Sequence, residues 1–145
     1  MMEEMTLADL PEVLQIEEES FASRWGEKDF RFEMTENPYA KLYVLRKDGK
    51  IVAYCDIWII FERMEVASIA VAKDYRKQGL GYQIMQFIDQ KGIENGCEFA
   101  FLEVRESNLP ARELYKKCGY IDLKVKRDYY QDNHEDAYEM MKGLA

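Results

Sequence analysis

One stretch of the sequence constrains the fold more than any other: a buried strand that passes through a glycine turn into a helix and then into a second buried strand. Residues 64–72 are rich in Val, Ile and Ala, and FAFLEV at 99–104 is equally apolar. Between them, Leu80, Ile84, Phe87 and Ile88 share one face of a helix predicted over 79–95. Such a crossover is right-handed and makes its two strands parallel. We therefore predict an α/β fold built on a parallel strand pair.

The remaining segments predict antiparallel strands and further helices around this pair. KLYVLRK at 41–47 and KIVAYCDIWII at 50–60 flank Asp48-Gly49, which is typical of a tight hairpin. Strands are also expected over 119–128 and 135–141, and helices over 10–20, 26–36 and 108–117. We expect the first helix to begin with a capping box formed by Asp9 and Glu12. At 145 residues, the chain fits a single domain spanning 1–145.

The charge of the chain is concentrated near its N-terminus. The chain has 28 acidic and 20 basic residues, a net charge of −8, and residues 1–36 hold eleven of the acidic residues against three basic ones. An acidic surface repels phosphate backbones, which argues against nucleic-acid binding. The same surface could attract a basic partner, or it could serve solubility alone.

The histidine and cysteine content excludes several kinds of site. The only histidine, His134, lies in a polar stretch and reads as an exposed turn residue, and Cys55, Cys97 and Cys118 lack the spacing of a zinc site. We expect no metal. The acidic N-terminus MMEEM is not a signal peptide, no apolar run reaches the ~20 residues of a membrane span, and unspaced cysteines suit reduced thiols. A cytoplasmic protein with no membrane association is the expectation.

The glycine turn has the geometry of an anion site. Glycines allow close approach of a ligand, and the free N–H groups at a helix N-terminus favour phosphate, with Arg76 and Lys77 adding positive charge. Neither the dinucleotide-binding fingerprint nor the P-loop motif is present. The ligand that the turn would bind is therefore the pyrophosphate of some other cofactor. Alternatively, Gly79 and Gly81 simply start the helix.

Two sets of residues carry a resemblance to a known family. Arg76-x-x-Gly79-x-Gly81 resembles the signature of the GNAT superfamily of N-acetyltransferases, which bind acetyl-CoA. FLEVRESNLPARELYKKCGY and KRDYYQDNHEDAYEM resemble the ribosomal-protein-alanine N-acetyltransferases of the RimI type. The resemblance spans the chain, most specifically 66–141. It implies the GNAT acyl-CoA N-acyltransferase fold: a mixed, mostly antiparallel seven-stranded sheet, about four flanking helices, and a parallel pair that splays near Ile69 and Leu102.

The resemblance also implies which residues bind acetyl-CoA, the co-substrate. Its acetyl and pantetheine parts would lie along one strand, in the manner of an added β-strand, and its pyrophosphate on the glycine turn. Asn108, at the start of the short helix, matches a position that contacts the cofactor. The strand and turn residues concerned are Ile69, Ala70 and Val71, and then Arg76, Lys77, Gln78, Gly79, Leu80 and Gly81.

Acetyl transfer to an amine needs a proton acceptor and a proton donor for the departing thiolate, and the resemblance assigns these roles to Glu103 and Tyr115. Glu103 ends a buried strand, where burial would make its carboxylate a stronger base, acting through water. Tyr115 follows Asn108 by seven residues on the same helix face and would also contact the CoA sulfur. From the residues alone, Glu103 could equally be a solvated strand-end carboxylate and Tyr115 a core aromatic.

The substrate implied by the resemblance is a protein N-terminus, usually the N-terminal alanine of the eighteenth small-subunit ribosomal protein, a basic partner. Peptide-binding roles are implied for Tyr130 and Tyr129, and Phe21 and Trp25 are similar candidates between the acidic helices. Transfer would be direct, within a ternary complex. Alternatives are acetylation of lysines or small amines, a non-catalytic acetyl-CoA-binding module, and a plain interaction domain. The sequence leaves the oligomeric state open between a monomer and a weak dimer.

Overall fold

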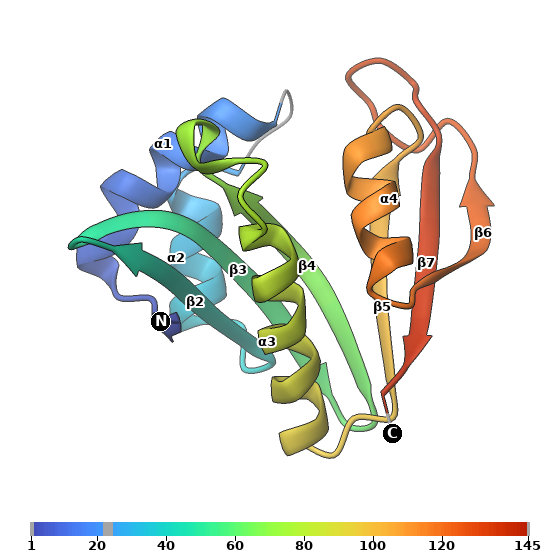
Figure 1. Cartoon of the computed structure of the whole chain (residues 1–145), viewed down its shortest axis with the longest axis horizontal. Coiled ribbons are helices and arrows are strands. Elements are labelled where there is room, and N and C mark those ends of the chain that lie inside the picture. The colour runs from blue at the N-terminus through green and yellow to red at the C-terminus, as the bar shows by residue number, and fades with distance from the viewer. Residues whose placement is uncertain (1, 22–24, 145) are drawn as a thin grey trace.

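A seven-stranded mixed sheet organises the molecule, seen in a computed structural model that describes residues 2–21 and 25–144 (Figure 1). Its strand order is β1-β2-β3-β4-β5-β7-β6, and every neighbouring pair is antiparallel except β4 and β5. The strands are β1 (Met2–Glu4), β2 (Ala40–Lys47), β3 (Lys50–Ile60), β4 (Arg63–Val71), β5 (Phe99–Arg105), β6 (Ile121–Lys126) and β7 (Ala137–Gly143). The predicted α/β fold with one parallel pair is confirmed.

The helices cover the two faces of this sheet unequally. They are α1 (Leu10–Ser20), α2 (Glu27–Thr35), α3 (Leu80–Glu94) and α4 (Leu109–Lys117), with 3-10 turns η1 (Leu7–Asp9) and η2 (Lys73–Tyr75). In Figure 1, α3 and α4 lie in front of the sheet, and α1 and α2 lie behind its N-terminal half. Among the described residues, no helix combines the length and apolar character needed to cross a membrane.

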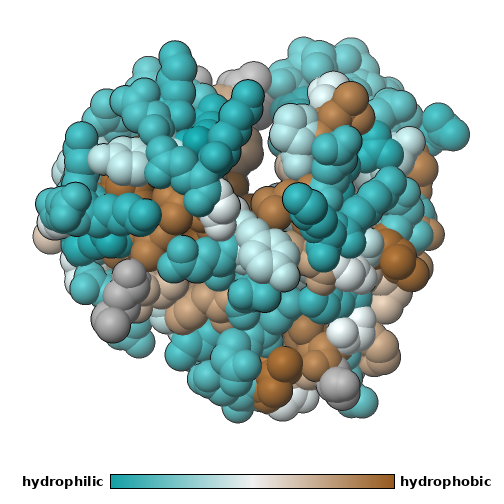
Figure 2. All heavy atoms as spheres, in the orientation of Figure 1, coloured by the Kyte–Doolittle hydropathy of each residue, from teal (hydrophilic) through white to brown (hydrophobic). Residues whose placement is uncertain are grey.

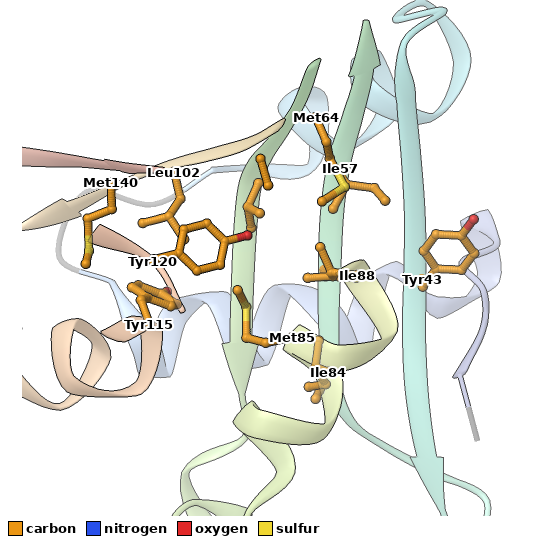
Figure 3. Close-up of a cluster of buried hydrophobic side chains, with 14 of the residues drawn as sticks. Tyr43, Ile57, Met64, Ile84, Met85, Ile88, Leu102, Tyr115, Tyr120 and Met140 are labelled. Atoms are coloured by element: carbon orange, nitrogen blue, oxygen red, sulfur yellow. The ribbon is translucent and has the colours of Figure 1, made fainter. Parts of the chain in front are cut away.

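Two apolar cores follow from this arrangement. The larger packs Ile84, Met85 and Ile88 of α3 and Tyr115 of α4 against the front face of the sheet (Figure 3). The smaller packs α1 and α2 against the back of β2, β3 and β4, where Phe30 meets Tyr54 edge to face at 5.6 Å between ring centroids. The two cores therefore pack against both faces of the N-terminal half of the sheet, which includes β4.

The start of the first helix differs from the prediction. The carboxylate of Asp9 accepts a hydrogen bond from the backbone N–H of Thr6 at 2.8 Å and pairs with Arg46 at 2.6 Å, so it caps η1 and not α1. Glu12 accepts the backbone N–H of Ile51 at 3.0 Å. The expected Asp9–Glu12 capping box was wrong, because both carboxylates serve contacts to other parts of the chain. Of the last two strands, β6 lies within the predicted 119–128 and is shorter, whereas β7 is shifted by two residues from 135–141; the short β1 was not predicted.

Candidate active site

The parallel strands β4 and β5 are paired over only part of their length. Pairing runs from Arg63 and Phe99 to Val66 and Leu102, and beyond that point the strands diverge, as Figure 1 shows. A β-bulge lies at the same place, because Ile57 of β3 pairs with Val66 and Asp56 with Ser68, leaving Ala67 without a partner in β3. A bulge bends its strand and increases the local twist. The splay that the resemblance implied is therefore present.

A cleft of about 600 Å³ occupies the opening between the two strands. Its walls come from the diverging parts of β4 and β5, the end of α1 with Phe21 and Trp25, the residues just before α4 with Tyr115 inside it, and the β6–β7 loop. Figure 2 shows a notch at the top of the molecule between the N-terminal half and the β6–β7 side, with mostly hydrophilic rims. Of the predicted site residues, the cleft brings together Phe21, Trp25, Ile69, Glu103, Asn108, Tyr115 and Tyr130.

The two predicted catalytic residues reach this cleft from opposite faces of the sheet. Leu102 and Val104 of β5 point into the front core together with Tyr115 of α4. Because side chains alternate along a strand, Glu103 points to the back face, away from α4. The cleft thus opens a passage through the sheet with a phenol on one side and a carboxylate on the other.

Glu103 is held by two neighbours. Its Oε2 accepts a hydrogen bond from Nζ of Lys126 on β6, and its Oε1 accepts one from the hydroxyl of Tyr129 at 2.9 Å. Lys126 also lies 3.9 Å from the carboxylate of Glu139 on β7. The carboxylate that the sequence places at the end of a buried strand therefore has a cationic and a phenolic partner.

Tyr115 is buried against the front core, with 8% of its surface exposed. Its ring meets that of Tyr120 edge to face at 6.2 Å between centroids. Burial, with smaller effects from Cys118 and Tyr130, raises the pKa of Tyr115 to about 12. The phenol consequently keeps its proton at neutral pH and can donate it.

Phe21 and Trp25 contribute to one wall of the cleft beside α1, and Glu17 of α1 holds the backbone of Trp25. Glu17 is 3% exposed and accepts the backbone N–H of Trp25 at 2.9 Å and the hydroxyl of Tyr54. Burial and the Glu17 carboxylate raise the pKa of Tyr54. Trp25 packs against Phe30 at 5.3 Å between centroids. The wall is thus tied to β3 and α2 through a buried acid that the sequence pattern did not single out.

The β6–β7 loop forms the opposite wall, and Arg105 anchors it. The guanidinium contacts the carboxylates of Asp132 at 3.0 Å and Glu135 at 3.4 Å, and it stacks over the ring of Tyr130 at 3.9 Å. Glu135 also accepts the backbone N–H of Ser107 at 2.6 Å. Hydrogen bonds from the side chain of Ser107 and then from its backbone are the main contacts that lower the pKa of Glu135 to about 2. Arg105 was missed, although it lies two residues after Glu103 and alternation places both on one face.

The paired tyrosines of this loop take different positions. Tyr130 lines the cleft, whereas Tyr129 is not among the lining residues and instead bonds to Glu103. The two rings meet edge to face at 5.2 Å between centroids. Only one of the two aromatic side chains therefore faces the cleft, and β6 ends before both residues.

The glycine turn lies beside the cleft but does not line it. Gly79 has φ +81°, which favours glycine, and precedes the first residue of α3. A Cβ at Gly81 would lie 2.9 Å from Cδ2 of Leu114, so this glycine permits close packing of α3 and α4. Arg76 donates to the carbonyl of Val71 and to Oγ of Ser20, each at 3.0 Å. Of the residues predicted to bind acetyl-CoA, Ala70, Val71, Arg76, Lys77, Gln78, Gly79, Leu80 and Gly81 lie outside the cleft lining.

The remaining candidates stay outside this site. His134 is exposed, has φ +60° and contacts Asp128 at 2.8 Å. The thiols of Cys55, Cys97 and Cys118 are free, and burial raises the pKa of each. Among the described residues, no group of three or more His, Cys, Asp or Glu side chains is arranged to hold a metal ion.

Comparison with known proteins places this architecture in a family. Residues 10–120 match the model of the acetyltransferase (GNAT) family. The chain belongs to that family, and it is an N-acetyltransferase.

Two relatives and one solved structure show which proteins of the family this chain is similar to. A Bacillus subtilis protein, provisionally named a ribosomal protein bS18-alanine N-acetyltransferase, is 40% identical over 136 residues, which cover 94% of this chain and 90% of that protein. The Escherichia coli bS18-alanine N-acetyltransferase is 32% identical over 139 residues, covering 94% and 93%. The crystal structure of an Escherichia coli ribosomal-protein-S18-alanine N-acetyltransferase has a TM-score of 0.91 at 29% identity, covering 100% of this chain and 94% of that one.

Proposed function

We propose that this enzyme transfers the acetyl group of acetyl-CoA to the N-terminal α-amine of a protein, namely the N-terminal alanine of ribosomal protein bS18, in the cytoplasm. The observation that carries the proposal is the passage between β4 and β5, with Tyr115 on its front side and Glu103 on its back side. A thioester entering from the α3–α4 face and an amine entering from the α1–α2 face would meet there. The relatives named above supply the choice of substrate.

Acetyl-CoA fits the front of the passage. Beyond Val66, β4 has no strand partner on the β5 side, so its edge at Ile69, Ala70 and Val71 could pair with an extended pantetheine; the Val71 carbonyl already accepts a hydrogen bond from Arg76. The N-terminus of α3 and the turn from Arg76 to Gly81 would take the pyrophosphate, for which backbone N–H groups and a positive helix end are suited. Asn108 caps α4 through a bond from Ala111 N–H at 3.3 Å and lines the cleft nearby.

The two proton transfers of the proposed reaction take place on opposite faces of the sheet. The neutral amine attacks the thioester carbon, the C–S bond breaks, and the sulfur takes the proton of the Tyr115 hydroxyl. The excess proton on the new amide nitrogen passes to Glu103, directly or through one water. Among the described residues that line the cleft, none is a cysteine, which favours direct transfer in a ternary complex over an acyl-enzyme.

The back of the passage suits a basic peptide. Four acidic side chains line the cleft: Glu17, Glu103, Asp132 and Glu135. Among the lining residues that the structure describes, only Arg105 carries a positive charge. Phe21, Trp25 and Tyr130 supply apolar surface for the first side chains of the substrate, with Tyr129 at the rim. Complementary charge raises the rate of capture and is weakened by salt.

A peptide assay tests this function. The enzyme is incubated with acetyl-CoA and an alanine-initiated basic peptide, once with its α-amine blocked and once with its lysines blocked, and mass spectrometry locates the acetyl group. We expect acetylation only where the α-amine is free. Acetylation only of free lysines would replace the proposal with a lysine acetyltransferase, and acetyl-CoA binding without transfer would indicate a non-catalytic module.

A further inference from the structure

The back face of β4, β5, β7 and β6 carries a group of charges beyond the cleft. Glu103 of β5 lies directly opposite Glu139 of β7, and Glu139 is only 7% exposed. Burial, and the charges of Glu103 and Glu139, raise the pKa of Glu65 on β4, while Arg63 and Lys126 act in the opposite direction. Three carboxylates therefore lie close together on a face that α4 does not cover.

Lys126 is the cation that contacts Glu103 within this group. Its Nζ bonds to Oε2 of Glu103, and its side chain, 31% exposed, also approaches Oε2 of Glu139 at 3.9 Å. The hydrogen bond to Glu103 raises the pKa of Lys126, so the ammonium stays charged at any working pH. The hydroxyl of Tyr129 occupies the other oxygen of Glu103.

We propose that Lys126 is a positioning residue for acetyl transfer: together with Tyr129, it fixes the orientation of the Glu103 carboxylate and keeps it available to accept the substrate proton. This inference rests on the proposed function, because it takes Glu103 as the base. Lys126 acts through Glu103 and is not itself among the residues that line the cleft.

The neighbours of Glu103 explain why a cation is needed there. Around it lie Lys126 from β6, Glu139 from β7, Glu65 from β4, and Tyr129 and Tyr130 from the loop. The other nearby cations serve other carboxylates: Arg63 lies 3.8 Å from Glu65 and 3.9 Å from Glu139, and Arg105 pairs with Asp132 and Glu135. Without Lys126, no cation of the described residues would be in ion-pair contact with Glu103. Like charges favour the protonated form of a carboxyl group, and an opposite charge within ~4–6 Å favours the ionised form.

Lys124 offers a matched control on the same strand. It is 61% exposed and lies 3.8 Å from Oε1 of Glu139, and it forms its ion pair with Glu139 and not with Glu103. Replacing Lys124 therefore removes the same charge from the same face without touching the base. Lys126→Arg keeps the charge and tests whether a cation suffices.

The experiment compares Lys126→Met, Lys126→Arg and Lys124→Met by their pH profiles of kcat and of kcat/KM on an alanine-initiated peptide. We expect Lys126→Met to lower kcat about tenfold or more at neutral pH and to move the acid limb of the profile up by about one pH unit. Lys126→Arg should retain most activity, and Lys124→Met should match the wild type. An unchanged profile in Lys126→Met, or an equal change in Lys124→Met, would overturn the proposal.

A second measurement is independent of activity. Carbon-13 NMR of glutamate-labelled protein follows the titration of the Glu103 carboxyl, assigned by its loss in Glu103→Gln. Its midpoint should be higher in Lys126→Met than in the wild type, and equal midpoints would refute the contact. If the wild type acetylates no α-amine, the proposed function fails, and the NMR titration still decides whether Lys126 controls Glu103.

Discussion

Asp56 of β3 is a buried acid whose removal should stabilise the protein. It is fully buried, and its carboxyl group lies next to the carboxylate of Glu33. Burial, followed by the neighbouring Glu33, raises the pKa of Asp56 from its ordinary 3.8 to about 10. Glu33 carries the negative charge of the pair and accepts bonds from Nε1 of Trp58 at 2.6 Å and Nδ2 of Asn37 at 3.0 Å. Asp56 also pairs with Ser68, beside the bulge that starts the cleft.

The size of the effect follows from that pKa. The folded state binds the Asp56 proton more tightly than the unfolded state, so this stabilisation is complete below pH 3.8 and is lost as the pH rises toward 10. The loss is about 1.4 kcal/mol per pH unit, or about 4 kcal/mol at pH 7. An asparagine has no such proton to lose. We expect Asp56→Asn to gain about 2 to 4 kcal/mol at pH 7, and progressively less toward pH 4.

Urea unfolding followed by tryptophan fluorescence at pH 5, 6, 7 and 8 measures this difference. The advantage of Asp56→Asn should grow with pH across the series. Asp122→Asn is the control, because Asp122 is a surface residue with a side chain 42% exposed and a long ion pair to Lys116. A difference between Asp56→Asn and wild type that stays constant from pH 5 to pH 8 would refute the reasoning.

Three further changes test the site. Tyr115→Phe should lower kcat about 100-fold by removing the proton donor, with acetyl-CoA affinity unchanged by calorimetry; wild-type turnover would exclude that role. Arg105→Met should raise the KM for the peptide about tenfold by releasing the β6–β7 loop, whereas an equal loss of acetyl-CoA affinity would show a general defect. Gly79 and Gly96 have φ values of +81° and +79°. Replacing either with Ala should lower the free energy of unfolding by about 1 kcal/mol, measured by thermal unfolding, but only Gly79→Ala should weaken acetyl-CoA binding. Equal binding by both would remove the glycine turn from the cofactor site.

Local pattern was enough to predict most of the fold. The hairpin around Asp48-Gly49 and the strand at Lys50–Ile60 are as predicted, and α3 lies within the predicted range between Gly79 and Asn95. The three residues of β1 were missed because MEE has neither apolar alternation nor β-branched residues, and pairing with β2 alone makes it a strand. The acidic side chains near the first helix were misread because their partners lie far along the chain.

Site residues that lie in a sequence motif could be predicted. Site residues that depend on contacts between distant parts of the chain could not. Glu103 and Tyr115 came from the family resemblance, and the structure brings both to one cleft. Lys126 contacts Glu103 across 23 positions of sequence, and Glu17 contacts Tyr54 across 37. These contacts depend on strand order and on the path of α1, which no local spacing encodes. The pyrophosphate role of Arg76 remains a prediction.

A crystal structure with CoA joined covalently to the amino group of an alanine-initiated basic peptide tests the central claim most directly. We expect the pantetheine to lie between β4 and β5 beyond Val66 and Leu102, with the sulfur beside the Tyr115 hydroxyl. The alanine nitrogen should lie within one water of Glu103 on the back face. A peptide leaving from the α3–α4 face, or a sulfur remote from Tyr115, would contradict the proposed passage through the sheet.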